Sequence, residues 1–267
     1  MPAGPKPVTC DPSTENDDKS GLLPTALVTG GAVRVGRILA LALAELGFAV
    51  AIHCNRATEA AEALAGTIEQ EGGRAVVVKG DLAEPGTAAA VVAAAVQGLG
   101  EPLGMLVNNA ALFVADSLPT LDPSTLRRQL AVNLEAPALL AQSYVAQLPA
   151  AAPGLVVNLS DQRVANPTAH YLSYSISKAG LEMLTAVLAR SLAPRIRAVN
   201  LALGQALPAP GMDPARFAEL VLATPLGRAT SAGEIGRALQ LIVRSPSMTG
   251  TTLTLDSGLA TGWLTPS

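Results

Sequence analysis

Short apolar runs alternate with amphipathic stretches along the chain from residue 23 to the end. Nearly continuous apolar runs are typical of strands buried on both faces, and runs that alternate with helices predict a parallel sheet covered on both sides, an α/β fold. The predicted strands are Thr25–Thr29, Ala49–His53, Ala75–Lys79, Met105–Asn108, Gly154–Leu159, Arg197–Leu201 and Thr252–Leu255. The predicted helices lie near Arg34–Leu46, Thr58–Glu71, Gly86–Leu99, Ser124–Gln147, Tyr171–Leu192 and Ala232–Val243.

Local signals agree with these helices and indicate a single domain. Asp122-Pro123 offers an N-cap followed by proline at the first helical position, and Ser231-Ala232-Gly233-Glu234 fits a capping box. With no internal repeat and no second composition zone, residues 23–267 are predicted to form one domain. The segment Gly204–Arg228 holds four prolines and is long for a connection, so we expect a lid or a binding loop.

Residues 1–22 differ in composition, being rich in Pro, Ser, Asp and Lys. They lack the basic start and apolar centre of a signal peptide, so we predict a disordered extension on a cytoplasmic protein. The 267-residue chain has no apolar run of membrane-spanning length, which argues against a membrane protein.

Charge and cysteine content exclude further classes. The net charge of −3 argues against a nucleic-acid partner, and Cys10 and Cys54 make neither a disulfide framework nor a metal site. Only 15% of residues are charged, and a surface so poor in charge is easiest to explain if part of it is buried between subunits.

The first predicted strand runs directly into the glycine turn Thr29-Gly30-Gly31-Ala32-Val33-Arg34-Val35-Gly36, after which a helix begins. Glycines allow the backbone to approach a pyrophosphate, and the free N–H groups and dipole of the helix attract it. The turn therefore predicts a dinucleotide site.

The end of the second strand indicates which dinucleotide is bound. An acid there would contact the ribose hydroxyls of NAD, but this chain reads His53-Cys54-Asn55-Arg56. The Arg56 guanidinium suits a 2′-phosphate, and Arg34 can add a second positive charge, so NADPH is favoured. The alternatives are that Arg56 is an ordinary surface residue and that His53 is a strand-end histidine with satisfied hydrogen bonds.

Tyr174 and Lys178 are four residues apart on a predicted helix and so lie on one face. A lysine beside a phenol lowers the pKa of the phenol, which would make Tyr174 a usable proton donor near neutral pH.

With these features together, the chain resembles the short-chain dehydrogenase/reductase family over nearly all of its length after the extension. The resemblance rests on the turn Thr29–Gly36, Asp81-Leu82, Asn108-Asn109-Ala110, Asn133, and Tyr174 with Lys178, in the family's order. It implies a doubly wound Rossmann sheet of seven parallel strands, NAD(P)-dependent hydride transfer and a homotetramer.

Three departures from the general family pattern are similar to its pteridine reductase branch. Arg34 replaces the middle glycine of the turn, Asp161 stands where the catalytic serine is expected, and Phe113 follows the Asn-Asn-Ala motif. Other positions depart from the branch: Ala111 lacks a hydroxyl, Leu203-Gly204 replaces Pro-Gly, and Asn55 and Ala57 replace polar residues that help to hold the 2′-phosphate.

The resemblance implies a role for each matching position. Proton transfer would use Tyr174 with Asp161, Lys178 would bind the nicotinamide ribose, and Asn133 would hold a relay water. The pterin or folate substrate would contact Arg34, Phe113, Asp161 and Tyr174, with Phe113 stacking on it. NADPH would contact Gly30, Arg34, Val35, Gly36, His53, Asn55, Arg56, Asp81, Leu82, Asn109, Ala110, Ala111, Ser160, Tyr174, Lys178 and Gly204.

Chemistry favours a pterin over a ketone because a pterin carries N–H donors that a carboxylate can accept, and a simple ketone has none. One alternative takes Ser160 as the catalytic hydroxyl of an NADPH-dependent ketone or 3-oxoacyl reductase. Ser160 and Asp161 cannot both face Tyr174 along one strand, and the spacing to Tyr174 favours Asp161. Another alternative is an NADPH-binding regulator without catalysis. Tyr171 is a second phenol, expected to pack or to line the pocket.

Overall fold

The structure is a computed structural model that describes residues 21–209 and 211–262. In this part of the chain seven strands form one sheet in the order β3-β2-β1-β4-β5-β6-β7, and every neighbouring pair is parallel. The strand predictions are confirmed. The strands are β1 Thr25–Val28, β2 Ala49–Cys54, β3 Ala75–Lys79, β4 Met105–Asn108, β5 Gly154–Asp161, β6 Ile196–Leu203 and β7 Thr252–Leu255.

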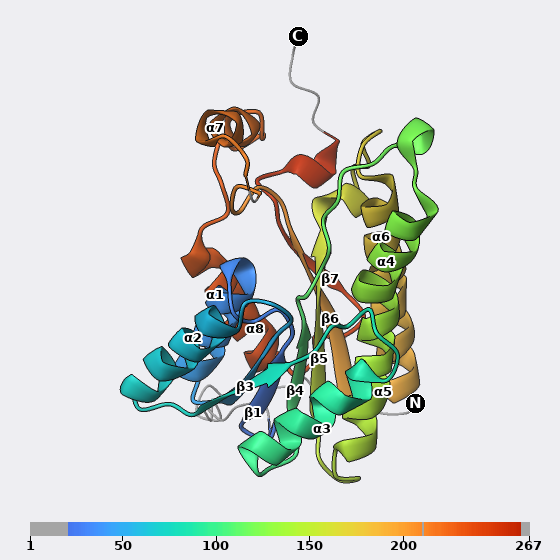
Figure 1. Cartoon of the computed structure of the whole chain (residues 1–267). Coiled ribbons are helices and arrows are strands. Elements are labelled where there is room, and N and C mark those ends of the chain that lie inside the picture. Colours follow the sequence, from blue (N-terminus) through green and yellow to red (C-terminus); the bar gives the residue numbers. More distant parts are fainter. Residues whose placement is uncertain (1–20, 210, 263–267) are drawn as a thin grey trace, which may run out of the picture.

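Helices cover both faces of the sheet, as expected (Figure 1). One layer consists of α1 (Arg34–Glu45), α2 (Thr58–Gln70) and α8 (Ala232–Arg244). The other consists of α3 (Thr87–Leu99), α4 (Pro123–Leu130), α5 (Ala136–Gln147) and α6 (Leu172–Leu192). Each layer packs its apolar side chains on the sheet, which gives two buried clusters on opposite faces of one domain.

The order of the strands decides where a ligand can bind. The chain builds outward from β1 to β2 and β3, and then returns to place β4 on the other side of β1. In a doubly wound sheet, ligands bind outside the carboxyl ends of the strands at such a reversal. The segments after β1, β4 and β5, which carry the predicted site residues, all begin at this edge.

The helix predicted over Ser124–Gln147 is interrupted. Its middle, Ala131–Glu135 (η3), is a π-helical turn between α4 and α5, and it contains Asn133. A continuous helical pattern gives no sign of such a turn, and single π-turns often occur at functional sites.

The segment Gly204–Arg228, predicted to be a loop, also contains a helix. It is α7, Pro214–Leu222, which stands above the sheet at the top of Figure 1. Asp213 caps it by accepting from the backbone N–H of Ala215, so the connection is partly ordered by an N-cap and a proline at the helix start.

The predicted extension, residues 1–22, lies outside the described residues except for Gly21 and Leu22, and Leu22 is already buried in the core. Across residues 21–209 and 211–262, no helix combines the length and the apolar character that crossing a bilayer requires. No group of three or more His, Cys, Asp and Glu side chains in the same described residues could hold a metal ion.

Candidate active site

The end of β5 separates two neighbouring side chains. Asp161 Oδ2 accepts a hydrogen bond of 3.0 Å from the hydroxyl of Tyr174, whereas Ser160 Oγ donates one of 2.6 Å to Glu182 Oε1. Side chains alternate along a strand, so only one of the two can face the phenol. Ser160 is the one that points away, which contradicts the assignment of its hydroxyl as the catalytic group.

Helix α6 carries Tyr174 and Lys178 on one face, as their spacing predicts. Both are buried, with exposed fractions of 7% and 3%. The ammonium of Lys178 donates to the carbonyl of Leu159 (2.6 Å) and lies 5.7 Å from the centre of the Tyr174 ring. The lysine is thus fixed between β5 and the phenol of Tyr174.

The electrostatics of the pair differ from the expectation that Lys178 lowers the pKa of Tyr174. Burial raises the pKa of Tyr174 well above its ordinary value, and the charge and hydrogen bond of Asp161 raise it further. The one opposing influence is the positive charge of Arg163. Burial also lowers the pKa of Lys178 to about 8, against the attraction of Asp161. The prediction was wrong because burial and the Asp161 carboxylate dominate the pKa of Tyr174, and the positive charge that lowers it belongs to Arg163.

Asn133 joins the loop after β4 to helix α6. Its side-chain oxygen accepts from the backbone N–H of Leu112 (2.7 Å), and its amide donates to Leu112 O (2.9 Å) and Ser177 Oγ (3.0 Å). Both amide hydrogens are therefore used, and a relay water would have to donate to the remaining lone pair of the oxygen. The relay role of Asn133 stays a prediction.

The glycine turn after β1 has the shape of an anion cradle. Gly30 has a φ of +59°, and a Cβ on Gly36 would lie 2.0 Å from the carbonyl oxygen of Gly30. Helix α1 has no side-chain cap at Val33 and no acid in its first turn, so its first N–H groups are left for a ligand. The chain therefore fits a dinucleotide pyrophosphate at Gly30, Val35 and Gly36.

Asn109 holds the turn in this shape. Its amide donates to the carbonyls of Thr29 (2.9 Å) and Gly30 (3.0 Å), and the backbone N–H groups of Asn109 and Ala110 donate to the hydroxyl of Thr29. Asn109 and Ala110 thus belong to the cofactor edge, with Ala111 exposed beside them.

His53 faces the protein and not the cleft. Its Nδ1 accepts from the backbone N–H of Gly30 (3.2 Å), and its Nε2 lies 3.1 Å from the carbonyl oxygen of Gly80. The alternative prediction, that His53 is a strand-end histidine with satisfied hydrogen bonds, is confirmed. Both ring nitrogens are engaged by the protein, so a contact of His53 with the cofactor stays a prediction.

Arg34 and Arg56 are not side by side. The guanidinium of Arg34 donates to the carbonyls of Pro208 (2.6 Å) and Leu207 (3.5 Å), whereas Arg56 is exposed after β2. Arg34, whose φ is 55°, therefore points to the segment after β6 and not to the expected 2′-phosphate end. This position is compatible with the predicted contact of Arg34 with the substrate. It is not compatible with the expectation that Arg34 and Arg56 bind the 2′-phosphate together.

Asp81, which was expected to hold the adenine, is tied to its neighbours. Its carboxylate accepts from the backbone N–H of Ala83 (3.0 Å) and from Arg128 (2.7 Å), and these bonds, with one from Asn55, lower its pKa. The neighbouring Leu82 is buried. Asp81 and Asn55 therefore form one hydrogen-bonded group, and their contact with the adenine stays a prediction.

Gly204 permits a close approach of two strand ends. A Cβ there would lie 2.7 Å from Cα of Asp256, and its backbone N–H donates to Leu255 O (2.9 Å). The glycine is therefore explained by packing, independently of any contact with the cofactor.

Phe113 and Tyr171 form an aromatic wall beside the phenol. The two rings are stacked, with centres 4.3 Å apart and planes at 7°, and Phe113 meets Tyr174 edge to face at 4.7 Å. Phe113 is 39% exposed, so part of the wall is open to a ligand. The expectation that Tyr171 packs or lines the pocket is confirmed.

Two further residues were not found from the sequence. Arg163 lies against both rings of the wall and forms an ion pair with Asp161. Asp116 accepts from the backbone N–H of Ser173 (3.2 Å) in the first turn of α6, and this bond fixes the loop that carries Phe113. The contact of Arg163 with the aromatic rings and that of Asp116 with Ser173 join separate elements, and no period in the sequence indicates them.

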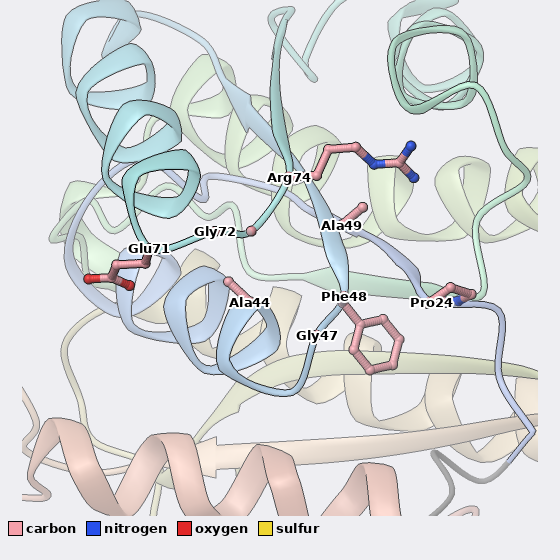
Figure 2. Close-up of a pocket in the computed structure, with 9 residues that line it drawn as sticks. Pro24, Ala44, Gly47, Phe48, Ala49, Glu71, Gly72 and Arg74 are labelled. Atoms are coloured by element: carbon pink, nitrogen blue, oxygen red, sulfur yellow. The ribbon is translucent and has the colours of Figure 1, made fainter.

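The hollow in Figure 2 lies at the other end of the sheet. It has a volume of about 350 Å³ and is lined by residues at the amino ends of β1, β2 and β3, among them Pro24, Ala49 and Arg74. These are the amino ends of the strands, whereas Tyr174 and Asp161 lie at the carboxyl edge. We therefore assign the site to the carboxyl edge on its chemistry.

Comparison with known proteins agrees with this geometry. The family described as short chain dehydrogenase matches residues 24–213. A FolM alternative dihydrofolate reductase 1 from Brucella canis, crystallised with NADP, is 40% identical with a TM-score of 0.88 and covers 93% of this chain and 98% of its own. The reductase LugOII, which catalyses keto-reduction in lugdunomycin biosynthesis, is 31% identical with a TM-score of 0.83 over 89% of this chain and 98% of its own.

A short-chain type dehydrogenase/reductase from Picea abies is 36% identical over 177 residues. That match covers 62% of this chain and 64% of the relative, so the shared part is less than two thirds of the spruce protein. With a family match over most of its length, a Rossmann sheet and an assembled Tyr174–Lys178 pair, this chain belongs to the short-chain dehydrogenase family.

Proposed function

We propose that the protein is an NADPH-dependent reductase of a pteridine, of the dihydropterin or dihydrofolate type. The observation that carries the proposal is the hydrogen bond of 3.0 Å between Tyr174 and Asp161, with the hydroxyl of Ser160 turned to Glu182. A carboxylate beside the phenol can accept the N–H groups of a pterin ring, which a serine would serve less well.

The likeness to a FolM alternative dihydrofolate reductase, 40% identical over 93% of this chain, supports the same substrate class. The likeness to LugOII at 31% identity leaves keto-reduction as the rival activity. The orientation of Ser160 argues against keto-reduction. A ketone reductase would use the hydroxyl of Ser160 beside Tyr174, but this hydroxyl points to Glu182. The hydrogen-bonded Tyr174 and the buried Lys178 speak against a regulator without catalysis.

NADPH, when bound, supplies the hydride, and the residues of the chain bind, orient and protonate. Gly30, Val35 and Gly36 would hold the pyrophosphate, and Arg56 would bind the 2′-phosphate. Lys178 would bind the nicotinamide ribose from its place beside β5.

The substrate lies against the Phe113 wall, with its N–H edge toward Asp161. Tyr174 gives its hydroxyl proton to the reduced ring, and its raised pKa means that the proton is present at neutral pH. Arg34 reaches the substrate from the other side of the cleft, where it now contacts the segment after β6.

The decisive experiment is a substrate panel with purified enzyme and NADPH. It compares dihydrobiopterin, dihydromonapterin and dihydrofolate with a simple ketone and a β-keto thioester, and follows NADPH consumption. We expect kcat/KM for one of the pteridines to exceed that for the carbonyl compounds by at least about a hundredfold. Turnover of the β-keto thioester without turnover of any pteridine would contradict the proposal. Tyr174→Phe, which removes only the hydroxyl, is the matched control and should abolish whichever activity is found.

We also propose a homotetramer. Ile176, Met183 and Val187 are exposed apolar side chains spaced along one face of α6, and Leu139 is exposed on α5. Apolar side chains that share a helix face and remain in contact with water favour a subunit interface. Light scattering of the purified protein tests this, and Met183→Glu should dissociate the assembly. A wild-type monomer at micromolar concentration would refute it.

A further inference from the structure

Arg163 occupies a position in the site that no sequence motif indicates. Its Nη1 lies 3.2 Å from Oδ1 and 3.4 Å from Oδ2 of Asp161, and its backbone N–H donates to Oδ1 at 2.9 Å. The central carbon of its guanidinium lies 5.4 Å from the ring centre of Phe113 and 5.0 Å from that of Tyr171. One cation therefore contacts both the catalytic carboxylate and the aromatic wall.

We propose that Arg163 is a positioning residue of the reductase site. It holds the Asp161 carboxylate against the Tyr174 phenol and fixes that carboxylate relative to the aromatic wall. The inference rests on the proposed function, because it concerns the same carboxylate that is to accept the substrate.

The hydrogen bonds of Asp161 show how the positioning works. Oδ1 accepts from the backbone and the side chain of Arg163, and Oδ2 accepts from Tyr174. A carboxylate held at both oxygens cannot turn about its own axis, so Oδ2 stays aimed at the phenol. The contact of Arg163 Nη1 with Oδ2, at 3.4 Å, is the longest of the four that Asp161 accepts, so it is the one that an N–H group of a substrate would replace.

The local fold makes this contact possible. β5 ends at Asp161, and the next three residues form a single 3-10 turn, Gln162–Val164 (η4). The turn folds Arg163 back onto the residue two positions before it, and Asp161 serves as the N-cap of the turn. In a continuing strand, the side chains of Asp161 and Arg163 would lie on one face. The backbone N–H of Arg163 could not then donate to the carboxylate of Asp161, as it does in the turn.

The placement of Arg163 is not optimised for stability. Its side chain is only 18% exposed, and its Nε is buried without a hydrogen-bond partner among the described residues. A buried donor without a partner destabilises the folded state, and such groups often mark functional sites. The rings of Phe113 and Tyr171 stabilise the cation through their faces and hold it where Asp161 needs it.

The charge of Arg163 also acts on the phenol. It lowers the pKa of Tyr174, in opposition to burial and to Asp161. Arg163 thus has the influence on Tyr174 that was expected of Lys178. This lowering of the Tyr174 pKa agrees with the place of Arg163 beside Asp161 and the proton donor.

The test compares Arg163→Gln, Arg163→Lys, Asp161→Asn and the double variant Asp161→Asn with Arg163→Gln. Arg74→Gln is the matched control, because Arg74 forms an ion pair with Glu101 (2.9 Å) at the opposite end of the sheet. For each protein, kcat with dihydrobiopterin, Kd for NADPH by fluorescence, and Tm without ligand are measured.

We expect Arg163→Gln to lower kcat by about tenfold to a hundredfold, the usual range for loss of a charge-assisted hydrogen bond, with Kd for NADPH changed by less than about twofold. Arg163→Lys keeps the charge and should recover part of kcat. The double variant should be no slower than Asp161→Asn alone, because an arginine that acts through Asp161 has nothing left to position. Arg74→Gln should behave as wild type.

Wild-type kcat in Arg163→Gln, or losses that multiply in the double variant, would overturn the inference while leaving the proposed function intact. If wild-type enzyme reduces no pteridine, the proposed function fails, and kcat is then measured with the carbonyl compound that is reduced. The Tm values then test the inference independently of the substrate. If the decreases in Tm for Asp161→Asn and Arg163→Gln add fully in the double variant, the two side chains are uncoupled and the inference is wrong.

Discussion

The backbone N–H of Gly30 donates a hydrogen bond of 3.2 Å to Nδ1 of His53, which joins the glycine turn to the end of β2. The other ring nitrogen lies 3.1 Å from the carbonyl oxygen of Gly80, so the proton of the ring belongs on Nε2. Burial lowers the pKa of His53, which keeps the ring neutral at pH 7. The histidine therefore supports the phosphate turn from behind.

His53→Phe should destabilise the protein and weaken NADPH binding. The ring would fit the buried volume, but the N–H of Gly30 and the carbonyl of Gly80 would lose their partners at a cost of about 1–3 kcal/mol each. We expect Tm to fall by several degrees and Kd for NADPH to rise. His170→Phe is the control, because His170 is the only other histidine and is exposed. Equal Tm values for the two variants would contradict the supporting role.

The same histidine should make the protein sensitive to acid. Its pKa in the folded state lies below the ordinary value of 6.5, so the unfolded chain binds a proton that the folded chain does not. Stability therefore decreases as the pH falls below 6.5. Tm measured between pH 5 and pH 7.5 should fall less steeply in His53→Phe than in wild type. Parallel curves would show that another group causes the acid sensitivity.

Arg56→Ala should change the choice of cofactor. Arg56 is exposed directly after β2, where a 2′-phosphate is expected, and a guanidinium binds phosphate with paired hydrogen bonds. We expect KM for NADPH to rise by about tenfold or more, while KM for NADH changes by less than about twofold. Arg74→Ala, remote from the cleft, is the control. Equal losses with both cofactors would place the phosphate contact elsewhere.

Lys178 should set an alkaline limit on activity. Its pKa is lowered to about 8 by burial, so the free enzyme loses the ammonium charge as the pH rises through that value. If the charged form binds the ribose, kcat/KM for NADPH falls above pH 8. The charge of Asp161 raises this pKa, so Asp161→Asn should move the limit to lower pH. A profile that stays flat to pH 10 in wild type would contradict this role for Lys178.

The strands and the position of the site could be predicted because they depend on simple periods. Strands buried on both faces appear as short apolar runs, and in a parallel sheet their carboxyl ends lie at one edge. Alternation along β5 was sufficient to separate Ser160 from Asp161, and helical spacing was sufficient to pair Tyr174 with Lys178. These relationships are set by backbone geometry within a single element.

The features that were missed depend on contacts between elements or on local turns. The π-turn around Asn133 leaves the helical pattern unchanged. Helix α7 has an N-cap signal, Asp213-Pro214, of the same kind as the one recognised at Asp122-Pro123, but four prolines in the segment obscured it. Arg163 reaches Asp161 only because β5 ends in a 3-10 turn, and no period in the sequence records where a strand turns.

The opposite orientation of two adjacent side chains gives the sharpest prediction for catalysis. Ser160→Ala removes a buried hydroxyl that contacts Glu182 and not the phenol. Because this hydroxyl touches neither Tyr174 nor Asp161, kcat should stay within about threefold of wild type. Asp161→Asn removes the charge that accepts from Tyr174, and kcat with a dihydropterin should fall by about a hundredfold or more, the usual contribution of an acid–base group. Kd for NADPH should remain near normal in both, which separates chemistry from cofactor binding. The reverse result, with Ser160→Ala inactive and Asp161→Asn active on a ketone, would identify a carbonyl reductase.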